Sequence, residues 1–267
     1  MGKRAQKVTV TRNGPYAVSG RIPLQKEIIL IGGEGEPEKW GKGKKYPQKE
    51  SYDLCRCGNS KNKPYCDGSH KASHFQGTET ASREPYSKLA RKIRGGGIIL
   101  CDAPSLCSAA RFCHPNGGVW SLAARSGNPK AKKAAIREAC NCPSGRLVAI
   151  ERKTGKAIEP GLKKSIGLVE DPQNACSGPI WLKGGIILVG ADGKKIRGAQ
   201  PRHALPLRPF AQQAVLRRNP HLSRVQRRGQ AFAQSEKERE LNSAQPGQLA
   251  LLPRPLVHEP VEQISRG

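Results

Sequence analysis

The sequence predicts an α+β fold: a small β-rich domain over residues 1–86, an α+β module over residues 95–189, and a disordered tail over residues 197–267. Three observations predict it. β-branched residues alternate with one another near the N-terminus. Short apolar runs and one well-capped helical segment share the middle of the chain. The composition then changes abruptly near Lys195.

Residues 8–31 predict β-structure. Valine and threonine alternate over residues 8–11, and Asn13-Gly14 is a typical hairpin turn. The apolar run at 28–31 is short enough for a buried strand. Residues 32–49 are rich in Gly, Glu and Lys and therefore predict a mobile loop.

The middle of the chain predicts a compact alternation of strands and helices. A polar linker over residues 75–86 leads into it, and a short helix is expected over residues 105–111. Asn128 is a good N-cap with a proline at the first helical position, so a helix is expected from there to about Cys140. Short strands are expected at residues 98–100, 119–123 and 147–150, and near Ile180 and Ile186.

Composition limits the classes of function. Hydrophobic residues make up 36% of the chain and aromatic residues 4%, so any core is modest. Small domains held by a metal tolerate a modest core, because metal binding supplies free energy of folding. No apolar run has the length of a transmembrane helix, and no secretory leader is recognisable, so a reducing cytoplasm is expected. The net charge of +26 is spread along the chain without interleaved aromatic residues, which favours a solvated basic surface over a nucleic-acid interface.

Three thiols and one imidazole fall within the sixteen residues CRCGNSKNKPYCDGSH, at Cys55, Cys57, Cys66 and His70. Four soft or borderline ligands at this spacing predict a metal site. A helical turn starting near Pro64 would bring Cys66 and His70 to the same side. The spacing alone is compatible with a structural zinc site of three cysteines and one histidine.

The string C-x-C-x2-S-x3-P-x-C-D-G-S-H, met at every position, resembles the CDGSH iron–sulfur domain, also described as a CDGSH-type zinc finger. The resemblance implies a [2Fe–2S] cluster, with Cys55 and Cys57 on one iron and Cys66 and His70 on the other. Three thiolates and a neutral imidazole carry one negative charge fewer than four thiolates, so the expected reduction potential lies above that of a plant-type ferredoxin.

His70 would also make such a site acid-labile, because protons compete with iron for the imidazole nitrogen. It is therefore the expected point of cluster release. Asp67 and Ser69 are expected either to orient the ligands or simply to form and cap the turn.

The 95–189 module carries cysteines of its own. Cys107, Cys113 and Cys142, the last directly before a proline, are similar to the divergent mono-cluster ferredoxin family. The resemblance implies a second cluster in a ferredoxin-like module. Three thiolates suit a [3Fe–4S] cluster, whereas a [4Fe–4S] cluster needs a fourth, which Cys101 or Cys140 could supply. The alternative is buried free cysteine.

Together the two resemblances imply an iron–sulfur protein for electron transfer or cluster transfer, with a redox protein or a cluster acceptor as its partner. No catalytic triad, phosphate loop or paired carboxylates indicate an enzyme. The alternative is a zinc-stapled binding module for nucleic acid or another anionic partner. Nucleic acid is disfavoured and no membrane is expected.

The tail differs from the rest in composition. Residues 1–196 hold 23 Lys and 12 Arg, whereas residues 197–267 hold 1 Lys and 11 Arg and lack Cys, Asp, Trp and Tyr. Codons that encode residues 197–221 can be chosen so that, read one base later, they give a second CRCG…CDGTH motif. The tail is therefore predicted to be a frameshifted remnant of that motif. A tandem protein could pair its two cluster domains within one chain, so this chain would expose that surface or form a homodimer.

Overall fold

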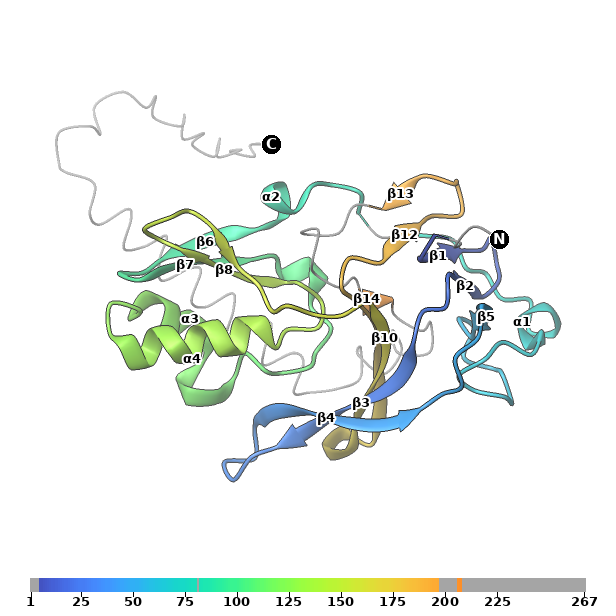
Figure 1. Cartoon of the computed structure of the whole chain (residues 1–267), viewed down its shortest axis with the longest axis horizontal. Coiled ribbons are helices and arrows are strands. Elements are labelled where there is room, and N and C mark those ends of the chain that lie inside the picture. The colour runs from blue at the N-terminus through green and yellow to red at the C-terminus, as the bar shows by residue number, and fades with distance from the viewer. Residues whose placement is uncertain (1–4, 81, 197–205, 208–267) are drawn as a thin grey trace, which may run out of the picture. The chain divides into compact units, whose positions relative to one another are not determined.

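The computed structural model describes residues 5–80, 82–196 and 206–207, so the predicted tail lies outside the described residues except for one short strand. Strands and a few helices make up the described part (Figure 1), which confirms the predicted α+β class. Its strands form three sheets within these residues.

The first sheet holds the N-terminal hairpin and the strand that leads to the first cysteines. Its order is β13-β12-β1-β2-β5, and β1 runs parallel to β12 but antiparallel to β2. The predicted Asn13-Gly14 turn joins β1 to β2, with Asn13 at a positive φ of 50°. The strands are β1 (Lys7–Val10), β2 (Tyr16–Ser19), β5 (Ser51–Leu54), β12 (Ile187–Val189) and β13 (Lys195–Ile196).

The second sheet has the order β14-β11-β10-β3-β4. Its strands are β3 (Leu24–Ile31), β4 (Pro37–Lys45), β10 (Ser165–Asp171), β11 (Cys176–Lys183) and β14 (Pro206–Leu207). β10 pairs with β3 in parallel, although the two strands are far apart in sequence. Strands from both ends of the described chain therefore share each of the first two sheets, while the division into modules at 1–86 and 95–189 stays a prediction.

Strand β4 corrects the expectation of a mobile loop over residues 32–49. It pairs with β3 in antiparallel fashion, with Trp40 opposite Ile29. β4 lies at the edge of its sheet, where lysine and glycine are tolerated and the usual alternation of apolar residues is not required. A strand of this composition carries no sequence signal, so only its pairing reveals it.

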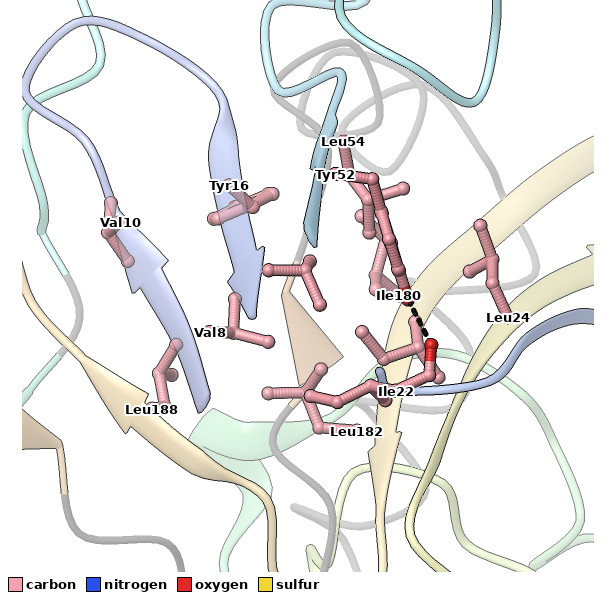
Figure 2. Close-up of a cluster of buried hydrophobic side chains, with 12 residues drawn as sticks. Val8, Val10, Tyr16, Ile22, Leu24, Tyr52, Leu54, Ile180, Leu182 and Leu188 are labelled. Carbon is pink, nitrogen blue, oxygen red and sulfur yellow. Dashed lines mark hydrogen bonds between the residues drawn. The ribbon is translucent and has the colours of Figure 1, made fainter. Parts of the chain in front are cut away.

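The main core lies between the first two sheets (Figure 2). It is built from the apolar faces of the strands, and the Tyr52 hydroxyl donates to the Ile22 carbonyl at 2.9 Å. Its buried members are Val8, Val10, Tyr16, Val18, Ile22, Leu24, Tyr52, Leu54, Ile166, Ile180, Leu182 and Leu188. Because Tyr52 and Leu54 belong to β5, this core fixes the strand that delivers Cys55.

The third sheet has the order β6-β7-β8-β9 and carries the two longer helices (Figure 1). Its elements are β6 (Arg91–Arg94), β7 (Ile98–Asp102), β8 (Leu147–Glu151), β9 (Ala157–Ile158), α3 (Val119–Ala124) and α4 (Pro129–Cys140). The remaining helical turns are α1 (Ser69–Ala72), α2 (Tyr86–Leu89), η1 (Pro104–Leu106), η2 (Pro115–Gly117) and η3 (Pro172–Asn174).

Helix α4 confirms the predicted cap, since the Asn128 side chain accepts hydrogen bonds from the backbone N–H groups of Lys130 and Ala131. Two other predictions are wrong. Residues 119–123 form helix α3 rather than a strand, and its buried residues Val119, Leu122 and Ala123 follow helical spacing.

The expected helix over residues 105–111 is the second error. It is replaced by the short η1 and an irregular loop with positive φ at Ala109 and Arg111. No helix in the described part of the chain is long and apolar enough to cross a membrane.

Candidate metal centres

The first site, defined as Cys55, Cys57, Cys66 and His70, is built by two short segments that lie antiparallel. Cys55 follows β5 directly, and an isolated bridge pairs Leu54 with Tyr65. The Cys55 N–H donates to the Pro64 carbonyl at 2.8 Å, and the Cys66 N–H donates to the Asp53 carbonyl at 2.9 Å. This backbone pairing brings the two halves of the motif together.

The side chains of the first site form two pairs. The sulfur atoms of Cys55 and Cys57 are 3.8 Å apart, and Cys66 Sγ lies 3.3 Å from His70 Nδ1. Two thiolates on one tetrahedral metal, with bonds of about 2.3 Å, lie about 3.8 Å apart. Each pair therefore has the spacing of two ligands on one metal atom. Among the described residues, no three potential ligands converge on a single ion.

The pairing of Cys66 with His70 does not come from a helical turn at Pro64. Helix α1 begins at Ser69, after Gly68 has turned the chain with a φ of 89°. A side chain at Gly68 would meet no atom within 4 Å, so space does not require glycine here. The left-handed backbone does, because it is readily accessible only to glycine. Cys66 and His70 lie close together as predicted, but the prediction of a helical turn starting near Pro64 is wrong.

Asp67 and Ser69 form the turn. Asp67 Oδ1 accepts from the Ser69 N–H at 3.0 Å and from the Ser69 hydroxyl at 2.7 Å, while Oδ2 accepts from the Lys61 N–H at 2.7 Å. The hydrogen bonds from Ser69, followed by the one from Lys61, lower the pKa of the Asp67 carboxyl. These contacts match the turn-forming role that was one of the two expectations.

Burial raises the pKa of the Cys57 thiol, while a hydrogen bond from the Asn59 N–H at 3.4 Å to its sulfur lowers it. Negative charge on Cys55 and Cys66 raises the pKa again. A thiolate here therefore requires a positive partner, and a bound metal supplies that charge.

Arg56, which lies between Cys55 and Cys57, anchors this part of the motif in the protein. The residue is buried at 8% exposure, and its guanidinium lies 5.4 Å from the ring centre of Tyr16 and 5.6 Å from that of Phe75. Nη1 donates to the Thr11 carbonyl at 3.2 Å and Nη2 to the Gly77 carbonyl at 2.6 Å. Cys55 and Cys57 are thus fixed by a side chain that points into the protein between them.

The second site is defined as Cys107, Cys113 and Cys142; Cys113 is buried and the other two are half-buried. Cys113 is buried, and burial raises the pKa of its thiol well above the ordinary value. The nearby Arg146 lowers that pKa, while negative charge on Cys107 and Cys142 raises it, so the three sulfurs share one electrostatic environment. The Cys142 thiol lies 3.3 Å from the Ser144 hydroxyl.

The two cysteines considered as a fourth ligand lie in different surroundings. The Cys140 thiol donates to the Ile158 carbonyl at 3.7 Å, which directs it toward β9. Cys101 is buried on β7, and burial raises the pKa of its thiol. The type of cluster at the second site stays a prediction.

A buried ion pair adjoins the second site. Arg146 donates to Asp102 through Nε at 2.6 Å and Nη2 at 3.0 Å, and the Trp120 indole N–H donates to the same carboxylate at 2.8 Å. Burial opposes ionisation of Asp102, but the hydrogen bond and charge of Arg146 outweigh it and lower the pKa of the carboxyl. Arg146 therefore stays a fixed positive charge close to Cys107 and Cys113.

Comparison with known families finds one match over each of the two ligand-bearing segments. Residues 13–71, hereafter the CDGSH segment, match the iron-binding zinc finger CDGSH type, and residues 93–152, the mono-cluster segment, match the divergent 4Fe-4S mono-cluster model. The chain is an iron–sulfur-binding protein. Both predicted resemblances are thereby confirmed. A search of curated proteins found no match to the chain.

Sequence reasoning missed the residues that hold these sites in place. Arg56, Arg146 and Trp40 touch the ligand-bearing segments without being ligands. For Arg56 a local signal existed in its position between the two cysteines of the motif. For Trp40 no local signal existed, because its contacts come from chain segments far away in sequence.

Proposed function

We propose that the chain carries a [2Fe–2S] cluster on Cys55, Cys57, Cys66 and His70 and acts in electron transfer or cluster transfer. The observation that carries the proposal is the arrangement of the four side chains in two pairs, with 3.8 Å between the sulfurs of one pair and 3.3 Å between sulfur and nitrogen in the other. A binuclear cluster needs two ligands for each iron. A single tetrahedral zinc needs all four around one point.

When bound, such a cluster supplies one-electron chemistry. The chain's own residues determine how firmly it is held. Three thiolates bind through sulfur, while His70 binds through an imidazole nitrogen for which protons compete. His70 and Cys66 are only half-buried, so water and an acceptor protein can reach this edge of the first site. His70 is therefore the ligand proposed to leave first.

A second cluster on Cys107, Cys113 and Cys142 is part of the proposal. Its support is the common electrostatic environment of the three thiols and the match of residues 93–152 to the mono-cluster family. Arg146 would favour the more negative, reduced form of a cluster here, because a buried positive charge stabilises added electron density. We further propose that the chain is a carrier rather than an enzyme and that it lies in the cytoplasm. Its proposed partner is a redox protein or a cluster acceptor.

The test is anaerobic purification of the full chain with analysis of iron, acid-labile sulfide and zinc. We expect two coloured centres and more than two irons per chain. Cys113→Ser should lower the iron content to two per chain. The matched control is Cys176→Ser, because Cys176 lies in β11 and belongs to neither proposed ligand set. A colourless protein with one zinc per chain would instead establish the zinc-stapled module.

A further inference from the structure

A strand of the CDGSH segment contacts two of the segments that carry the second site. Trp40 lies on β4, and its indole N–H donates to the backbone carbonyl of Asn141 at 3.2 Å. Asn141 caps the C-terminus of α4 and directly precedes Cys142. Carbonyls at a helix end have no partner within the helix, so this hydrogen bond supplies one and fixes the chain next to a proposed ligand.

The same indole also contacts the other ligand-bearing loop. The ring centres of Trp40 and Phe112 are 4.6 Å apart with a tilt of 36°, and Phe112 is 3% exposed and directly precedes Cys113. Trp181 of β11 lies 4.9 Å from Trp40 and completes the aromatic group. One side chain therefore touches the neighbours of both Cys113 and Cys142.

The loop that carries Cys107 and Cys113 needs such support. Ala109 and Arg111 both have a φ of 62°, a left-handed conformation that is unfavourable for residues other than glycine. Backbone of this kind persists where surrounding contacts hold it. Here Arg111 donates through Nη2 to both carboxylate oxygens of Asp171 at 2.9 Å, at the end of β10. Like Trp40, Asp171 belongs to the second sheet and lies outside the mono-cluster segment.

We propose that Trp40 is a positioning residue for the second site, holding the segments of Cys113 and Cys142 at the separation that a shared cluster requires. The role in cluster binding rests on the proposed function, but the positioning itself can be measured without a cluster. Through Trp40 of β4, the CDGSH segment thus supports the two segments that carry Cys113 and Cys142.

The experiment uses the full chain with Trp40→Ala, Trp40→Phe and the control Leu30→Ala. Leu30 lies on the neighbouring strand of the same hairpin, but its side chain is partly exposed at 37%. Metal-free proteins are treated with a thiol-alkylating reagent, and rates at individual cysteines are read by peptide mapping. Iron content and the electron paramagnetic resonance of the loaded proteins, recorded in both the oxidised and the reduced state, provide the second readout.

In Trp40→Ala, alkylation of Cys113 and Cys142 is expected to be at least about tenfold faster, since loss of a large aromatic contact lowers the cost of local opening. Trp40→Phe keeps the stacking but loses the indole hydrogen bond, so Cys142 should accelerate more than Cys113. Rates at Cys57 and Cys66, the internal reference, should not change. The loaded alanine variant should lose the second signal and keep the first.

Unchanged alkylation rates at Cys113 and Cys142 in Trp40→Ala would overturn the inference, as would an equal acceleration at Cys57 and Cys66, which would indicate general loosening. Failure of the proposed function looks different. If the wild-type protein holds no second cluster but Trp40→Ala still exposes both thiols selectively, the positioning role stands and the second cluster is wrong.

Discussion

Glu138 gives the sharpest prediction of stability. This residue of α4 is 2% exposed, and its Oε1 accepts from the Asn116 side-chain amide at 3.0 Å. Oε2 is buried with no hydrogen-bond partner in the described part of the chain. Burial raises the pKa of the carboxyl from 4.5 to about 7, against smaller opposing effects of Asn116 and Arg137.

The sign and size of the effect follow from linkage. Between pH 4.5 and about 7 the folded protein holds a proton on Glu138 that the unfolded chain has released, so stability falls as pH rises through this window. A pKa change of one corresponds to about 1.4 kcal/mol, so the rise from 4.5 to about 7 corresponds to about 3 kcal/mol. Below pH 4.5 Glu138 is protonated in both the folded and the unfolded state, so its burial no longer lowers the stability.

The perturbation is Glu138→Gln, which keeps an oxygen to accept from Asn116 and cannot ionise. Urea unfolding, followed by tryptophan fluorescence, should give similar free energies of unfolding for variant and wild type at pH 4. The variant should be more stable by up to about 3 kcal/mol at pH 8.

The control is Glu151→Gln on β8. The hydrogen bond from Lys132 lowers the pKa of the Glu151 carboxyl, so the stability that this carboxylate contributes is lost as pH falls. The difference in stability between Glu151→Gln and wild type therefore has the opposite sign to that of Glu138→Gln. A difference between Glu138→Gln and wild type that stays constant from pH 4 to pH 8 would refute the reasoning.

Four further predictions concern the motif, the helices and the tail. His70→Cys should keep a cluster, lower its potential and shift its loss of colour to a lower pH; loss at the wild-type pH would exclude His70 as the release point. Arg56→Lys should destabilise the loaded protein by about 2 kcal/mol and shorten the lifetime of its visible absorbance, because an ammonium cannot bridge the same two carbonyls in the same fork; an unchanged lifetime would contradict the anchoring role. Asn128→Ala should cost about 1 kcal/mol in urea unfolding through loss of the helix cap, and Asn128→Ser should recover most of it. Resequencing the gene should reveal a CRCG…CDGTH motif one base out of register over residues 197–221, and its absence from genomic DNA would refute the frameshift.

What the sequence could predict was local in origin. The alternation in β1, the Asn13-Gly14 turn and the capped start of α4 depend on residues within a few positions of one another, and all three are present. The spacing of the four residues of the first site likewise predicted a metal site, and their side chains meet in two pairs because the residues lie within one loop.

Tertiary structure decided the elements whose stability comes from distant partners. Strand β4 exists because β3 offers it hydrogen bonds, although its own residues carry no strand pattern. Helix α3 begins with β-branched and aromatic residues, but burial at helical spacing against the third sheet outweighs their strand preference.

The second site depends most on such long-range contacts. Its three cysteines were visible in the sequence, but the loop of Ala109 and Arg111 is held by Asp171, and Trp40 joins the segments of Cys113 and Cys142. The sequence by itself predicted which side chains would bind a cluster. Only the packing of strands from both ends of the described chain determined what keeps those side chains in position, because such contacts leave no periodic trace along the chain.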